Sequence, residues 1–165
     1  MFEIKEGQCQ MVHLNTRLEK HGDVEVVACD LNFVWETHNG MLAMFAPDLR
    51  GALYKRADDR QAELDPDPDH LVALRFSAID TIKWGQGDVI GGALTFHTGV
   101  SAKSHVTVED VKVTKFRLTC KEGGTVVIGF KVQCRPSSAE MGKFTGFLQA
   151  KDCLISVTPP GQDPD

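Results

Sequence analysis

The sequence predicts a β-rich α+β fold: an antiparallel sheet, a sandwich or a partly open barrel of about six to seven strands, with two to three short helices packed on it. Three observations support this class. Apolar residues alternate along most of the chain, a glycine-containing loop joins the two clearest alternating segments, and two short segments show helical spacing instead. The chain has 165 residues, enough for one domain with a full core. We expect residues 1–158 to form that domain.

Two long strands are expected first, over residues 8–18 and 23–36, with a turn at residues 20–23. The second strand changes phase between Val26 and Val27. A one-residue slip moves the apolar side chains to the other face, as a β-bulge does, so this strand is predicted to be bent by a bulge.

Residues 40–54 show helical spacing interrupted by Pro47, which predicts two short helices or one kinked pair. Their apolar side chains are expected to pack on the sheet: Met41, Leu42, Phe45, Leu49 and Leu53. Residues 57–69 are predicted to be a loop, since Pro66 and Pro68 remove backbone donors and the acidic side chains repel each other.

The second half of the chain is expected to be mostly strands, at residues 71–76, 89–98, 106–120, 125–135 and 153–157. The loop Glu122-Gly123-Gly124 predicts a hairpin between the third and fourth of these. Ser137 and Glu140 form a capping box that opens a helix ending near Gln149. A polar tail, residues 159–165, is expected to be disordered.

Charge is concentrated in one segment. Residues 57–69 hold six acids and one Arg, which equals the whole formal net charge of -5. A chain with one charged segment and a balanced remainder is expected to meet partners through local patches. The candidate partner-binding residues are Asp58, Asp59, Glu63, Asp65, Asp67 and Asp69.

A second, basic surface follows from the predicted hairpin. Facing Lys121 with Thr125 places Lys115 opposite Lys131. Arg117 and Arg135 join them on the outward face, and Lys112 lies on the other phase unless a bulge near Thr114 realigns it. This face is either a solvated surface that protects a strand from aggregation, or an anion-binding surface for a nucleic-acid backbone or for the acidic segment of this same chain.

No catalytic or metal motif is present, so we expect a protein that is not an enzyme and has no cofactor and no metal. His105-Val106-Thr107 has the His-x-Thr form of two-histidine phosphoesterases, but the second copy that they need is missing. The five cysteines are odd in number and widely spaced, which favours reduced, buried thiols in the cytoplasm. No apolar run is long enough to cross a membrane, and Trp35, Trp84 and Tyr54 are expected to be core or rim residues.

The chain resembles a group of small phage and prophage proteins without an established activity, over residues 12–157. The segments that carry the resemblance include Ala28-Cys29-Asp30-Leu31, Phe45-Ala46-Pro47-Asp48-Leu49-Arg50, Ile82-Lys83-Trp84, Lys115-Phe116-Arg117 and Gly123-Gly124-Thr125-Val126. The resemblance implies a phage protein made in the cytoplasm of a bacterial host.

Two function classes follow. The first is a non-enzymatic protein that binds a host or phage protein, for instance to inhibit a host defence nuclease by presenting the acidic loop as a phosphate mimic. The second is a single-stranded-DNA-binding or recombination accessory protein that uses the basic hairpin face. The negative net charge and the lack of an aromatic platform favour the first. A homo-oligomer is compatible with both.

Overall fold

The structure is a computed structural model that describes residues 1–57 and 70–164. Its strands are, in chain order, β1 (Ile4–His21), β2 (Val24–His38), β3 (Tyr54–Arg56), β4 (Leu71–Leu74), β5 (Thr81–Trp84), β6 (Val89–Phe96), β7 (Val106–Cys120), β8 (Thr125–Cys134) and β9 (Asp152–Thr158). Its helices are the 3-10 helices η1 (Asn39–Met44) and η2 (Ala102–Ser104) and the α-helices α1 (Leu49–Leu53) and α3 (Ser138–Ala150).

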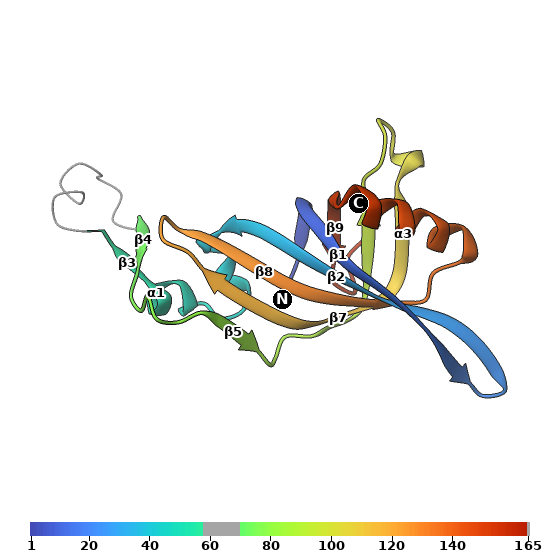
Figure 1. Ribbon diagram of the computed structural model, residues 1–165, viewed down its shortest axis with the longest axis horizontal. Coiled ribbons are helices and arrows are strands. Elements are labelled where there is room, and N and C mark those ends of the chain that lie inside the picture. The colour runs from blue at the N-terminus through green and yellow to red at the C-terminus, as the bar shows by residue number, and fades with distance from the viewer. Residues whose placement is uncertain (58–69, 165) are drawn as a thin grey trace.

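The long strands close into a barrel. Within the described residues, seven strands form one antiparallel sheet in the order β5-β7-β6-β9-β1-β2-β8, and β7 also pairs with β8. This extra pairing joins β8, at one end of the order, to β7, which is next to β5 at the other end. As a result β1, β2, β8, β7, β6 and β9 form a closed ring (Figure 1). The β-rich α+β class predicted from the sequence is confirmed. Closure leaves few unpaired strand edges, which protects the sheet from pairing with other chains.

Aromatic rings fill the barrel between its two ends. The Phe2 ring lies 4.9 Å from that of Phe116 and 5.1 Å from that of Phe130. Toward the other end, the Phe96 ring stacks 4.3 Å from Phe147 of α3. Each fully buried ring contributes about 1.5–3 kcal/mol of transfer free energy. Helices η1 and α1 lie at one end of the molecule and α3 lies at the other (Figure 1).

Local signals placed several elements correctly. Lys121 N–H donates to the Thr125 carbonyl at 2.8 Å, and Gly123 and Gly124 adopt φ of 94° and 90°, the left-handed conformation that the hairpin loop requires. Ser137 caps α3 by accepting a hydrogen bond from Glu140 N–H at 3.2 Å. Leu42 is buried, and the other apolar side chains of η1 and α1 pack against the core as expected.

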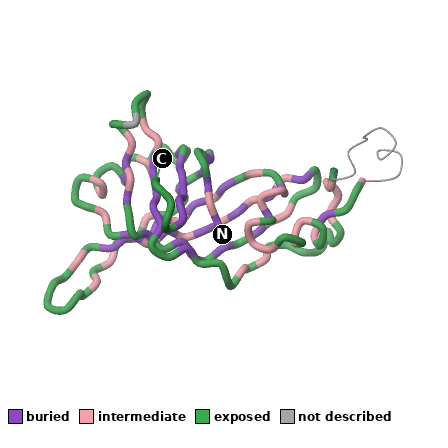
Figure 2. Tube along the Cα trace, turned by 180° about the vertical axis from the view of Figure 1, so that it is seen from behind, coloured by how far each residue is buried: buried purple, intermediate pink, exposed green. Residues whose placement is uncertain are grey.

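The bulge predicted in the second strand is wrong. β2 pairs with β8 without interruption from Cys29 to His38, and the register shift lies in β1, between Met11 and His13. The change of phase in the sequence has another cause. The β1–β2 hairpin extends beyond the barrel, so Val24 and Val27 are exposed at its tip (Figures 1 and 2).

Two short strands, β3 and β5, had no counterpart in the sequence pattern, whereas β4 lies within the strand predicted over residues 71–76. β3 and β4 form a separate two-stranded sheet, and β5 pairs with the end of β7 that β6 leaves free. Pro159, the first residue of the predicted tail, is buried at the end of β9.

Candidate anion-binding site

The basic residues of the hairpin gather on the outer face of the barrel, where β2, β8, β7 and β5 lie side by side. Arg117 of β7 pairs with Gly129 of β8 on one side and with Lys83 of β5 on the other. Lys131 pairs with Asn32 of β2. Directly paired residues in a sheet point to the same face, so these cations form a row across neighbouring strands, which are spaced about 4.8 Å apart.

A bulge in β7 gives Lys115 its position. The β7–β8 register shifts between Thr114 and Arg117, and Lys115 adopts a φ of 59°. Thr114, and not Lys115, therefore pairs with Lys131, so the predicted Lys115–Lys131 pair is wrong. The realignment considered for Lys112 does occur: Lys112 pairs with Gln133 and joins the outward face. A bulge lets two successive side chains leave the strand on one side, which separates Lys115 from the like charge of Lys131.

Lys115, Arg117 and Lys131 surround a hollow in this face. The hollow has a volume of about 540 Å³, and the described residues that line it include no carboxylate: Val12, Asn32, Phe33, Val34, Lys115, Arg117, Gly129, Phe130 and Lys131. The Phe33 and Phe130 side chains are buried in the core, so the rings are not stacking platforms. The polar side chains of the hollow suit an oxyanion. Two ammonium groups and one guanidinium are hydrogen-bond donors, and the Asn32 amide donates through its nitrogen and accepts through its oxygen.

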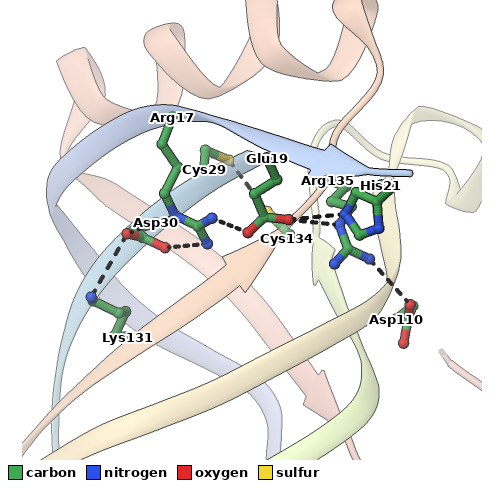
Figure 3. Close-up of polar contacts among 9 residues, drawn as sticks. All are labelled: Arg17, Glu19, His21, Cys29, Asp30, Asp110, Lys131, Cys134 and Arg135. Atoms are coloured by element: carbon green, nitrogen blue, oxygen red, sulfur yellow. Dashed lines mark hydrogen bonds and ion pairs between the residues drawn. The ribbon is translucent and has the colours of Figure 1, made fainter. Parts of the chain in front are cut away.

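A paired cluster lies next to the hollow (Figure 3). Arg17 donates to Glu19 and to Asp30, at 3.2 Å from Asp30 Oδ1, and Lys131 Nζ lies 3.7 Å from Asp30 Oδ2. Arg135 Nε donates to Glu19 Oε2 at 3.1 Å. Asp30 is buried, and the two cations compensate its charge. This part of the basic surface is held in place by carboxylates.

The electrostatics of Glu19 reflect this pairing. Hydrogen bonds from Arg17, Arg135 and His21 lower the pKa of the Glu19 carboxyl to about 2. At neutral pH, Glu19 is therefore fully ionised and neutralises part of the charge of Arg17 and Arg135.

The predicted cations thus divide into two groups. Arg135 lies 4.0 Å from Asp110 in addition to its bond to Glu19, and Lys112 lies 4.0 Å from Asp88. By contrast, Lys115 and Arg117 make no ion pair with any described residue. Unpaired cations lose no existing partner when an anion binds, so these two are the predicted cations best placed to accept one.

Sequence reasoning missed Lys83, Arg17 and Asn32. Lys83 is on a four-residue strand whose pairing with β7 is not local. Lys83 also makes no ion pair within the described part of the chain. Arg17 could have been found, because the turn at residues 21–24 fixes the β1–β2 register and places Arg17 and Asp30 on one face.

The acidic candidates cannot be placed on this surface. Residues 58–69 lie outside the described residues, and with them lie all six: Asp58, Asp59, Glu63, Asp65, Asp67 and Asp69.

A nucleophile–histidine–carboxylate arrangement exists elsewhere in the barrel. The Ser156 hydroxyl and His97 Nε2 are 2.7 Å apart, and His97 Nδ1 lies 3.9 Å from Glu6 Oε1. The Ser156 side chain is only 1% exposed, so a substrate has no route to its hydroxyl. His105 stacks edge-on against His97, at 4.6 Å between ring centroids, and forms no second site. We assign this group to the packing of β6 against β9.

Residues 1–57 and 70–164 contain neither a metal-ligand cluster nor a membrane-spanning helix. No group of three or more His, Cys, Asp or Glu side chains there could hold a metal ion. No helix in those ranges combines the length and apolar character needed to cross a membrane. Comparison of the chain with protein-family models, with curated proteins and with solved structures gave no match.

Proposed function

We propose that this protein is a non-enzymatic binding protein that holds single-stranded nucleic acid by its phosphates on the β2–β8–β7–β5 face. The observation that supports this is the hollow lined by Lys115, Arg117 and Lys131, with no carboxylate among the residues of its lining that the structure describes. Lys83 extends the same surface across β5. Arginine binds phosphate oxygens in a two-pronged geometry and lysine adds a point charge.

The extent of the cationic surface favours one strand over a duplex. Glu19, Asp30 and Asp110 border it, so a wide polyanion would meet these carboxylates. A single strand that follows Lys83, Arg117 and Lys115 avoids them, and it approaches Asp30 only where it reaches Lys131. Because the core rings do not reach the surface, binding rests on phosphates and should tolerate many base sequences. The resemblance to phage proteins supports a role in phage DNA metabolism.

The test is fluorescence anisotropy with labelled thymidine and adenosine oligonucleotides and with a matched duplex, across a salt series. Each phosphate contacted by a cation contributes a slope of about -0.7 to the dependence of log K on log salt for single strands, so contacts to Lys83, Lys115 and Arg117 give roughly -2. Lys143 is an exposed cation on α3, away from this face, so Lys143→Ala serves as the control for any variant of the cations on the face. Absence of salt-dependent binding, or a stronger preference for duplex, would contradict the proposal.

A second candidate is an interaction protein that uses the acidic segment. The observation that favours it is the concentration of six acids within residues 57–69. In this role, Asp58, Asp59, Glu63, Asp65, Asp67 and Asp69 imitate the phosphates of a nucleic acid and occupy a host or phage protein, such as a defence nuclease. Electrostatic attraction of this kind weakens with salt.

This candidate is tested by replacing the six acids with Ser and Asn. Partner capture from infected bacterial lysate should then be lost, while oligonucleotide binding by the basic face persists. Unchanged capture would mean that the segment only keeps the protein in solution.

A further inference from the structure

Two cysteines that are distant in the sequence face each other beneath the paired cluster. Cys29 of β2 and Cys134 of β8 are directly paired across the strands, and their sulfur atoms lie 3.4 Å apart (Figure 3). Directly paired residues of antiparallel strands have Cα atoms about 4.5–5.5 Å apart. A disulfide spans about 4.4–6.8 Å between Cα atoms. A bond between these sulfurs therefore needs side-chain rotation but no movement of the strands.

The pair is also reachable from outside the barrel. Cys134 contributes to the lining of a second hollow, of about 230 Å³, whose wall includes Arg17, Glu19, Lys112 and Arg135. A water molecule occupies about 30 Å³ in the liquid. The hollow is therefore large enough to bring a small neutral oxidant such as hydrogen peroxide next to the Cys134 sulfur, and the buried Cys29 sulfur lies 3.4 Å from that atom.

We propose that Cys29 and Cys134 are a reversible oxidation site, which hydrogen peroxide converts into a cross-strand disulfide and a thiol reductant reopens. The Cys29 thiolate attacks one oxygen of the peroxide, which forms a sulfenic acid and releases hydroxide. The Cys134 sulfur then attacks the sulfenic sulfur, and the hydroxyl group leaves with the thiol proton as water. In total, two thiols and one peroxide give one disulfide and two waters, so the two electrons pass from sulfur to oxygen.

The hydrogen bond within the pair assists the first step. The two thiols share a hydrogen bond, and this bond with Cys134 lowers the pKa of Cys29. The thiolate is the form that reacts with peroxide.

A second pair of cysteines provides an internal comparison. Cys9 of β1 and Cys153 of β9 are also directly paired. The Cys153 thiol is turned toward two carbonyl oxygens, at 3.8 Å from that of Phe147 and 3.6 Å from that of Lys151. Burial raises the pKa of Cys9. This pair is held as thiols and should oxidise much more slowly.

The experiment treats the folded protein with hydrogen peroxide, blocks free thiols with N-ethylmaleimide and maps disulfides by mass spectrometry. We expect one dominant link, Cys29–Cys134, that dithiothreitol removes. Cys134→Ala should abolish it, and Cys9→Ala should leave it unchanged. The link joins residues 105 positions apart, so the melting temperature of the unsubstituted protein should rise on oxidation, on the order of 5 °C.

Three results would overturn the proposal. These are free Cys29 and Cys134 after peroxide treatment, a link that forms only in denaturant, and a dominant disulfide involving Cys9, Cys120 or Cys153. The melting temperature before and after oxidation is measured on the unsubstituted chain, so the conclusion does not depend on whether the Cys134 variant folds. It also does not depend on the ligand of the basic face.

Discussion

The basic face contains two neighbouring regions with the same kind of side chain and different surroundings. In the paired cluster, Arg17, Lys131 and Arg135 lie against Glu19 and Asp30. In the hollow, Lys115 and Arg117 lack an ion pair with any described residue. The difference indicates that the cations of the two regions have different roles. Cations that already have a carboxylate stabilise the barrel, and cations without one remain available to an outside anion.

The largest change in affinity should come from removing the two cations of the hollow that have no ion pair among the described residues. The double variant Lys115→Ala/Arg117→Ala should lower affinity for single-stranded oligonucleotide by about 30- to 100-fold at low salt, since each lost phosphate contact costs about 1–1.4 kcal/mol. The salt slope should become shallower by about 1.4. Stability should change little, because neither side chain supports another group.

Anisotropy and thermal melting test this prediction together. The double variant Lys20→Ala/Lys143→Ala removes two exposed cations elsewhere and serves as the matched control. Equal losses in the two double variants would show that overall charge, and not the hollow, governs binding.

The converse change affects the paired cluster. Asp30→Asn leaves Arg17 and Lys131 without their buried carboxylate, so we expect a loss of about 1–3 kcal/mol in the free energy of unfolding. Affinity for oligonucleotide should be unchanged or higher, because Lys131 becomes free to bind phosphate. Urea denaturation measures the first effect, with the exposed Asp163→Asn as control. If Asp30→Asn lowered the affinity for oligonucleotide but kept the free energy of unfolding unchanged, the paired cluster would serve binding and not stability.

A pH series separates the regions further, because the cluster contains a titrating group. The pKa of Glu19 is lowered to about 2 in the folded protein, below the usual 4.3 of an unfolded chain. The unfolded state therefore binds a proton first as the pH falls, so the contribution of Glu19 is complete above about pH 4.3 and is lost as the pH falls toward 2.

The measurement is the urea midpoint between pH 5 and 2. We expect the midpoint of Glu19→Gln to fall less steeply than that of the unsubstituted protein in this range. Parallel curves would show that Glu19 is not stabilised by Arg17 and Arg135 in solution.

The two regions also differ in how far the sequence revealed them. The β7–β8 hairpin and the cap of α3 depend on local signals, Gly123-Gly124 and Ser137-Glu140, and both were predicted. From the hairpin register, the sequence placed Arg117 and Lys131 on one face. Barrel closure and the β5 pairing that adds Lys83 depend on contacts between distant segments, which one sequence does not encode in a readable pattern.

A bulge near Thr114 was considered from the sequence, but its position at Lys115 could not be predicted, for a different reason. A left-handed residue in a strand is usually marked by Gly, and here the position holds Lys with a φ of 59°. Without the bulge, Lys115 would lie opposite Lys131. An L-residue in this conformation costs about 1–2 kcal/mol, so the lysine is kept at the expense of local backbone strain, as is common at binding sites.

The smallest predicted effect tests this interpretation. Lys115→Gly should relieve the strain but make the unfolded chain more flexible, so the net gain in the free energy of unfolding should be small, about 0.5–1 kcal/mol. Lys115→Val should lower the free energy of unfolding by at least as much, because a β-branched residue is disfavoured at positive φ. Both variants should bind oligonucleotide equally weakly, since both lack the ammonium group. Opposite changes in stability with the same loss of affinity would show that the backbone at this position costs stability and that the side chain serves binding. If Lys115→Gly instead destabilised the protein, the aliphatic stem of Lys115 would be part of the packing of β7. The strained backbone would then be explained by packing, and not by a lysine that is kept for binding.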